Sequence, residues 1–199
     1  KINAVGTPDK PIVMTSEKEE PGAWGGIHIC GRAHTNAEGG KGSSEIGGAV
    51  YGGNDDADNS GTLQYIRLEY TGFAFDEEHE ANGISFYGVG NGTIVDHCQA
   101  YKGSDDGFEF FGGSVNVSNL VAVSCSDDSF DWTEGWNGKG TNLVAYQEAE
   151  STLGYDCDCL MECDNNGSNN AATPVAHPVL KNLILVGNGG SKQGIRLRA

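Results

Sequence analysis

Short triplets with apolar or small residues at their first and third positions recur along the chain. One set comprises residues 66–68, 98–100, 120–122, 143–145 and 183–185. A second set, with a polar or charged middle residue, comprises residues 27–29, 84–86, 108–110, 130–132 and 195–197. This alternation has the period of a β-strand, in which successive side chains point to opposite faces. In the second set we expect the outer members to face a core and the middle residue to face water.

The spacing of these motifs predicts a repeat of about 22 residues. Two Ser-Asp-Asp segments begin at Ser104 and Ser126, 22 positions apart. The first set of triplets begins at positions 66, 98, 120, 143 and 183. A coil of about 22 residues explains these starts if the chain also carries two insertions, at about residues 31–60 and 148–178. We expect the first insertion, which is rich in Gly, Asn and Asp, to lie outside the repeating structure.

Two strands in each repeat cannot bury their apolar residues alone and must stack on neighbouring repeats. The sequence therefore predicts an all-β fold, a right-handed single-stranded parallel β-helix. Residues 1–199 are expected to form a single β-helix domain. Because neither end resembles a cap, we expect the chain to be a piece of a longer protein.

A polar residue directly precedes the apolar triplet in several coils. Asn119, Asn142 and Asn182 hold this position, and His97 holds it in an earlier coil. Stacked Asn amides can donate to one another along the axis of a solenoid. We predict a structural Asn ladder at a bend of the coil.

The chain resembles the pectate-lyase-like class of right-handed β-helix proteins. Within that class it is similar to secreted bacterial β-helix surface proteins, often predicted lipoproteins, whose function is not assigned. The segments that carry the resemblance are residues 10–13, 21–27, 59–70, 105–113 and 194–198. The resemblance implies a secreted, periplasmic or outer-surface location and brings no proven substrate.

Acidic residues outnumber basic ones by 28 to 12, which gives a formal net charge of −16. Nucleic acids and anionic membranes need clustered Lys and Arg, so the charge argues against both as partners. We also expect no membrane span, because the sequence has no apolar run of the roughly 18 residues that a membrane helix needs. Divalent cations fit the charge.

Stacking of the repeats is expected to bring six carboxylates to one side of the solenoid. Asp105 should lie over Asp127, and Asp106 over Asp128. Glu109 should lie near Asp131, and Glu134 is a further neighbour of this group. Like charges at this spacing call for a cation or a proton, and Ca²⁺ takes six to eight oxygen ligands. The alternatives are a pure turn-forming role for these Asp residues, or catalysis by a carboxylate pair.

Two further groups are candidates for binding or cross-linking. Trp136 lies in a Gly-rich turn beside Glu134. We expect Trp136 to be the best exposed aromatic residue and a carbohydrate contact, with Glu134 as a second ligand-binding residue. Cys98 falls on an apolar position and is expected to be a small buried hydrophobe. We expect at least one disulfide in the region of four cysteines, with the pairing open. These are Cys125, Cys157, Cys159 and Cys163.

No complete set of catalytic residues is present. The leading hypothesis is a non-enzymatic cell-surface or extracellular module that binds a glycan or a partner protein, with Ca²⁺ as a stabilising ion. A polysaccharide lyase or glycoside hydrolase of the β-helix class is the first alternative. A structural protein that self-associates end to end is the second, since open solenoid edges can template pairing.

Overall fold

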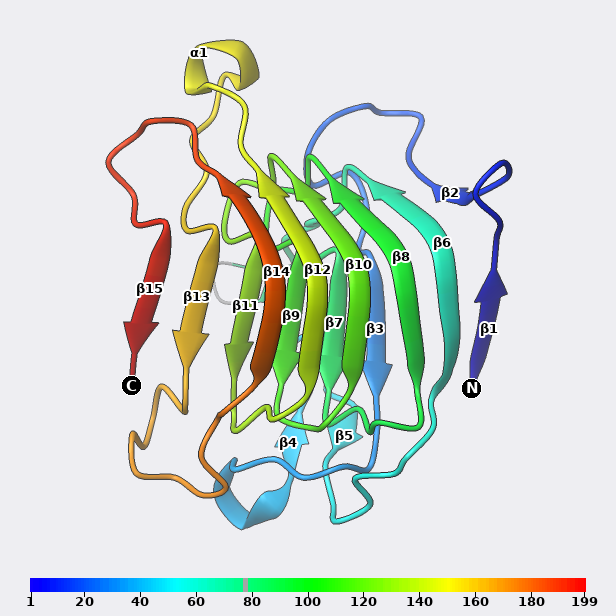
Figure 1. The fold of residues 1–199 in the computed structure, drawn as a ribbon, viewed down its shortest axis with the longest axis vertical. Helices are drawn as coiled ribbons and strands as arrows, with labels where there is room; N and C mark the ends of the chain where they lie inside the picture. The colour runs from blue at the N-terminus through cyan, green and yellow to red at the C-terminus, as the bar shows by residue number, and fades with distance from the viewer. Residues whose placement is uncertain (77–78) are drawn as a thin grey trace.

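The computed structural model describes residues 1–76 and 79–199. Over these residues the chain winds as a right-handed parallel β-helix (Figure 1). The predicted fold class is confirmed. One helix, α1 (Glu150–Leu153), and a 3₁₀ turn at Glu38–Gly40 lie outside the coils.

The described residues form two parallel sheets that run the length of the solenoid. We call the first the bent sheet. Its strands are β1 (Ile2–Val5), β2 (Ile12–Met14), β6 (Gly61–Glu69), β8 (Ile94–Tyr101), β10 (Asn116–Val123), β12 (Lys139–Tyr146) and β14 (Val179–Val186). We call the second the short sheet. Its strands are β3 (Ile27–Cys30), β7 (Ile84–Tyr87), β9 (Phe108–Phe111), β11 (Phe130–Thr133), β13 (Met161–Asp164) and β15 (Ile195–Arg198).

Equivalent residues of successive coils stack in register. In the bent sheet, Leu143 pairs with both Leu120 and Leu183. In the short sheet, the ring of Phe108 stacks on Phe130 with centroids 5.5 Å apart. Stacked aromatic pairs of this kind add about 0.5–1.5 kcal/mol beyond the burial of their area. Outside the last coil, the apolar members of both triplet sets therefore build one continuous core, as the alternation predicted.

Each long strand of the bent sheet contains one residue in the left-handed region, which bends the coil. These residues are Tyr65, His97, Asn119, Asn142 and Asn182, with φ between 52° and 57°. Asn tolerates this conformation better than most residues because its short side chain bonds locally.

The predicted Asn ladder is present at this bend. Nδ2 of Asn142 donates to Oδ1 of Asn119 over 2.8 Å, and Nδ2 of Asn182 donates to Oδ1 of Asn142 over 3.0 Å. Asn119 in turn donates to the carboxylate of Asp96 over 2.8 Å. His97 shares the bend position and stacks on Tyr65 with ring centroids 4.5 Å apart. The structural interpretation of these residues is confirmed.

The first insertion lies outside the coils, where β4 (Gly42–Ser43) and β5 (Val50–Tyr51) form a small antiparallel hairpin. The second predicted insertion is wrong in its extent. β13 lies inside the range 148–178 and belongs to the short sheet, where it pairs with β11 and β15. The coil is interrupted twice, once before and once after β13, and the spacing of the bent-sheet triplets alone could not reveal the strand between them.

The last coil leaves core-facing positions open to solvent. Ile195 is 51% exposed and Leu197 is 79% exposed, although their partners in β13 are buried. End-to-end self-association stays a prediction.

Candidate cation-binding pocket

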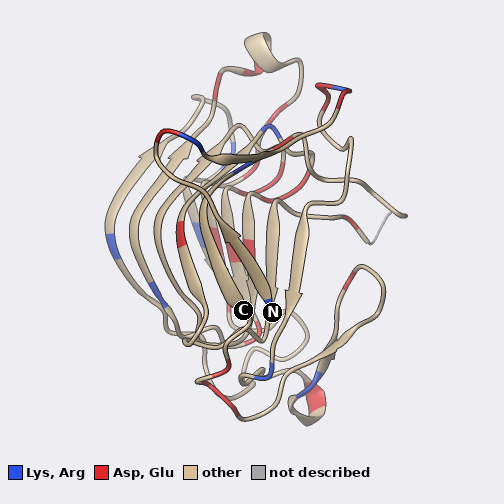
Figure 2. Cartoon of the chain, turned by 90° about the vertical axis from the view of Figure 1, so that its right-hand side faces the viewer, with Lys and Arg blue, Asp and Glu red and all other residues tan. Residues whose placement is uncertain are grey.

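A pocket of about 370 Å³ lies on the outward face of the short sheet and is lined almost entirely by charged side chains. Figure 2 shows Asp and Glu positions gathered over neighbouring coils of the solenoid. All six predicted metal ligands line the pocket. The full lining is Glu45, Glu80, Asp105, Asp106, Glu109, Asp127, Asp128, Asp131, Asp158, Glu162, Arg196 and Arg198.

In the central coils the middle residues of the short-sheet triplets do not all face water, so the expectation is wrong there. Ser85 is fully buried and Glu109 is only 8% exposed. Loops cover this face of the sheet: Glu45 reaches it from the first insertion and Glu80 from the segment before β7. The sheet therefore has apolar side chains on its inner face and covered carboxylates on its outer face.

The turn before each short strand stacks as the repeated Ser-Asp-Asp motif predicts. The backbone N–H of Asp128 donates to Oδ1 of Asp106 over 2.8 Å, and the N–H of Cys159 donates to Oδ1 of Asp128 over 2.6 Å. Asp106 and Asp128 thus each use one oxygen to hold the turn of the next coil. These bonds are the turn-forming role weighed from the sequence, and they leave the second oxygen of each carboxylate for other partners.

Burial and mutual repulsion disfavour the ionised form of these carboxyls. Burial, with the nearby charge of Asp127, raises the pKa of Asp105 to about 7. Burial, again with Asp127, raises the pKa of Asp128 to about 8. The pKa of Glu109 is raised well above its usual value by burial and then by Asp131. These carboxyls therefore favour a bound proton or a cation near neutral pH.

Two groups of three carboxylates bring their oxygens close enough to share an ion. Asp106, Glu109 and Asp131 each offer an oxygen within 4.8 Å of the others. Asp105, Asp106 and Asp127 do the same nearer the mouth of the pocket.

Oδ1 of Asp131 is the clearest sign of a missing partner. It is buried and accepts no hydrogen bond from any residue that the structure describes. Such an orphaned acceptor costs about 1–3 kcal/mol, and more if it is charged.

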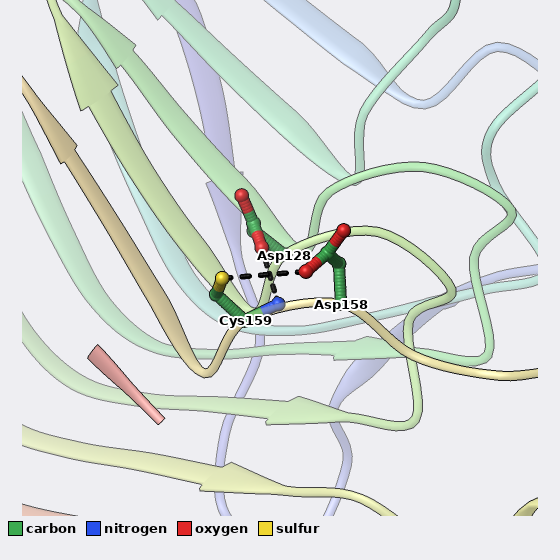
Figure 3. Close-up of side chains that lie close together, drawn as sticks. All are labelled: Asp128, Asp158 and Cys159. Atoms are coloured by element: carbon green, nitrogen blue, oxygen red, sulfur yellow. Dashed lines mark hydrogen bonds between the residues drawn. The ribbon is translucent and has the colours of Figure 1, made fainter. Parts of the chain in front are cut away.

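A third group contains sulfur. Asp128, Asp158 and Cys159 face one another at the turn before β13 (Figure 3). The Cys159 thiol donates to Oδ1 of Asp158 over 3.3 Å, and Asp158 also pairs with Nζ of Lys192 at 2.8 Å. Because Lys192 already neutralises Asp158, this corner of the pocket needs a cation less than the corner at Asp131.

The C-terminal end of the pocket carries its own counter-charges. Nη1 of Arg196 lies 3.0 Å from a carboxylate oxygen of Glu162. Arg198 pairs with Glu162 and, at 2.9 Å, with Asp164. The acidic column is therefore neutralised by protein in the last coil and not in the coils of β9 and β11.

Four carboxylates of the pocket were not predicted. Asp158 and Glu162 belong to the coil of β13, where Glu162 pairs with Asp131 in register. The triplet Met161-Glu162-Cys163 has the same apolar–polar–apolar pattern as residues 130–132, so a signal was present but was hidden by the changed spacing. Glu45 and Glu80 come from loops, and no repeat marks them.

Trp136 is not an exposed aromatic, and that prediction is wrong. Its side chain is 1% exposed and its ring stacks on Phe110 with centroids 4.1 Å apart. Its Nε1–H donates to the carbonyl of Val115 over 3.2 Å. The turn directs the indole inward, where it fills the core beyond the end of β11 and is not available to a sugar.

Glu134 binds within the protein rather than lining the acidic pocket. Its Oε2 accepts hydrogen bonds from the hydroxyls of Thr35, at 2.6 Å, and Tyr51, at 2.8 Å. Glu134 therefore holds the first insertion against the end of β11. Its other carboxylate oxygen makes no hydrogen bond to a described residue.

The predicted disulfide is not formed, since all six cysteines are free thiols. Five of the six are buried, and burial raises the pKa of the Cys125 thiol to about 11. Burial likewise raises the pKa of the Cys157 thiol to about 12. Cys98 is 1% exposed in the core, as expected for a small hydrophobe.

In-register parallel coils with a continuous apolar core define the class of parallel β-helix proteins. The chain matches the family described as the pectate-lyase like beta helix domain over residues 1–199, and it belongs to that family. Domains of this family are typically extracellular. Neither the curated proteins nor the solved structures provided a match. Among the described residues, no helix has the length and apolar character needed to cross a bilayer.

Proposed function

We propose that this domain is a non-enzymatic extracellular β-helix module that binds Ca²⁺ in the acidic pocket. The bound ion stabilises the covered face of the short sheet and prepares that face to hold a glycan or a partner protein. The proposal places the ion among Asp106, Glu109 and Asp131, with Asp105, Asp127 and Asp128 around it.

The observation that carries this proposal is the buried, unpartnered Oδ1 of Asp131 beside two other buried carboxylates. Three like charges in a low-dielectric site destabilise the folded protein unless a positive charge joins them. In the last coil Arg196 and Arg198 supply that charge, and among the described residues they are the only basic side chains that line the pocket. A divalent cation would satisfy the orphaned oxygen and relieve the repulsion together.

The donor set favours Ca²⁺ over other common ions. The ligands are carboxylate oxygens, which suit hard cations, whereas Zn²⁺ prefers nitrogen and sulfur. Ca²⁺ accepts irregular arrangements of six to eight oxygens, whereas Mg²⁺ demands an octahedron and gives up its water reluctantly.

Thermal unfolding with and without the ion tests the proposal. With millimolar Ca²⁺ the midpoint should rise by several degrees over the value in chelator, because an ion at 100 times its Kd stabilises by about 2.7 kcal/mol. Mg²⁺ at the same concentration should give a smaller rise. Asp131→Asn should lose most of the response, as should the pair Asp105→Asn/Asp127→Asn.

Asp9→Asn is the matched control, because Asp9 is exposed and lies outside the pocket. It should respond to Ca²⁺ as the unaltered protein does. The same midpoint in Ca²⁺ and in chelator would overturn the proposal and leave the aspartates as turn residues.

Hydrolysis of a glycan is a second candidate, favoured by one specific observation. A pKa of about 8 keeps the Asp128 carboxyl protonated at neutral pH, as a general acid must be. Product formation on a panel of acidic and neutral polysaccharides, lost in Asp128→Asn, would support an enzyme. Binding without turnover on the same panel would favour the module.

A further inference from the structure

A second pocket, of about 580 Å³, lies between the two inserted segments. Its walls are residues 36–38 of the first insertion, residues 133–134 at the end of β11, and residues 166–169 after β13. It shares no lining residue with the acidic pocket. Its volume is in the range typical of small-molecule sites.

Buried amides hold the two insertions together and fix the walls of this pocket. Nδ2 of Asn36 donates to Oδ1 of Asn165 over 3.0 Å, and Nδ2 of Asn166 donates to Oδ1 of Asn36 over 2.9 Å. Oδ1 of Asn166 accepts the backbone N–H groups of Ser168 and Asn169, each at 2.9 Å. The loop that carries residues 166–169 is thus ordered before any ligand arrives, which lowers the entropic cost of binding.

Several polar groups of the lining are left without a protein partner. Within residues 1–76 and 79–199, no hydrogen bond engages the hydroxyls of Thr133 and Ser168, and none engages the carboxylate of Glu38. Glu134 is held through Oε2 alone, so its Oε1 is also available. Hydroxyls donate and accept, whereas the carboxylates only accept, so the pocket calls for a ligand rich in donors.

The charge of the lining further limits the chemical class of the ligand. Glu38 and Glu134 contribute two carboxylates, and none of the described residues that line the pocket is Lys, Arg or His. Uronates, phosphates and sulfates would be repelled, and an apolar ligand would strand the polar groups. From these features we infer that this pocket binds an amino sugar, whose hydroxyls meet Thr133 and Ser168 and whose protonated amine meets Glu38 and Glu134. The inference does not depend on the cation proposed for the other pocket.

Isothermal titration with three tetrasaccharides tests this inference, using oligomers of glucosamine, N-acetylglucosamine and galacturonate. The titrations are made at about pH 6, where an amine of this kind is protonated, and in excess Ca²⁺, which competes with the amine for the acidic pocket. Glucosamine should bind at least tenfold more tightly than N-acetylglucosamine, and galacturonate should not bind. Charge-assisted hydrogen bonds of the expected strength account for this ratio.

Variants locate the binding. Glu38→Gln should weaken glucosamine binding roughly tenfold without affecting folding, because Glu38 is exposed and its carboxylate accepts no hydrogen bond from a described residue. Ser168→Ala should weaken binding of both amino and N-acetylated oligomers. Glu150→Gln, an exposed carboxylate on α1, is the matched control and should bind as the unaltered protein does.

Asp131→Asn separates the two pockets. It should keep glucosamine binding even though it is expected to lose the response to Ca²⁺. Equal affinities for the amino and N-acetylated oligomers would overturn the role of the charge. No binding, or binding lost in Asp131→Asn and kept in Glu38→Gln, would overturn the site.

Discussion

Two columns of polar residues run along this solenoid, and they solve the same stacking problem differently. In the Asn ladder at the bend, each amide donates to its neighbour and accepts from the next, as in the bonds from Asn182 to Asn142 and from Asn142 to Asn119. In the acidic column, Glu109 and Asp131 occupy paired register positions but both are acceptors when ionised. The Asn ladder therefore satisfies its own stacked polar groups, whereas the acidic column does not.

The difference shows why repetition alone does not reveal function. A side chain with both a donor and an acceptor can be stacked indefinitely, even at an exposed position such as that of Asn142. A carboxylate repeated in a covered pocket accumulates charge with each coil and needs a proton, an arginine or a metal ion. Among the described residues, the arginines that line the acidic pocket both come from the last coil. We therefore interpret the Asn ladder as structural and the acidic column as the functional feature.

The pH dependence of stability should give the largest effect that separates the two columns. The folded-state pKa values of about 7 for Asp105 and about 8 for Asp128 lie above the ordinary value near 3.8. The folded state therefore binds more protons than the unfolded state between these limits. Stability in chelator should be greatest near pH 4 and should fall, on the order of several kcal/mol, as the pH rises through 7 and 8.

Urea unfolding at a series of pH values in chelator measures this fall. Saturating Ca²⁺ should flatten or reverse it, because the ion takes the place of the protons and binds only the ionised carboxylates. A free energy of unfolding that rises steadily from pH 5 to pH 8 in chelator would contradict the raised pKa values. Variants of the Asn ladder should leave the slope unchanged.

Conversion of the acidic column into an amide column should have the next largest effect on stability. In Glu109→Gln/Asp131→Asn both carboxylates become amides of the same shape, which can donate to one another as the ladder amides do. Glu109 already accepts a bond from Nδ2 of Asn82 at 2.6 Å, and Gln can keep it. At pH 8 in chelator the variant should be about 2 kcal/mol more stable than the unaltered protein.

Denaturant unfolding in chelator measures this gain. At pH 5 the gain should be smaller, because the raised pKa values of Glu109 and Asp131 favour their protonated, uncharged forms as the pH falls. The variant should also lose its response to Ca²⁺. A loss of stability at pH 8 would mean that the carboxylates are satisfied by the protein after all.

The sequence predicted most of the fold because the signal is physical and local. Alternation identified the strands, and the repeat of about 22 residues placed Asp105 over Asp127 and Glu109 beside Asp131. The repeat could not predict which segments cover these carboxylates. Glu45 and Glu80 reach the pocket from loops of irregular sequence, and loops bury the middle residues that a strand pattern assigns to water.

The errors have a shared cause in the irregular segments. Trp136 follows a strand in a Gly-rich turn, a setting typical of the surface, yet its indole enters the core. β13 was assigned to an insertion because two interruptions disguise its coil. Periodicity reports which face a strand residue takes, and it carries no information where the chain leaves the repeat.

Asn142→Ala should have the smallest effect on stability. It tests the comparison through the Asn ladder instead of the acidic column. The variant loses the bond to Asn119 and the bond from Asn182, and it places Ala at a φ of 57°. We expect a loss of about 1–2 kcal/mol, since the site is exposed and water replaces part of the hydrogen bonding. Asn142→Gly removes the same bonds but accepts the left-handed backbone, so it should lose less and the difference gives the cost of strain. Both losses, measured by urea unfolding, should be the same at pH 5 and pH 8 and with or without Ca²⁺. A loss that changes with Ca²⁺ would show that the two columns are coupled through the coil, and the ladder would then be part of the cation site.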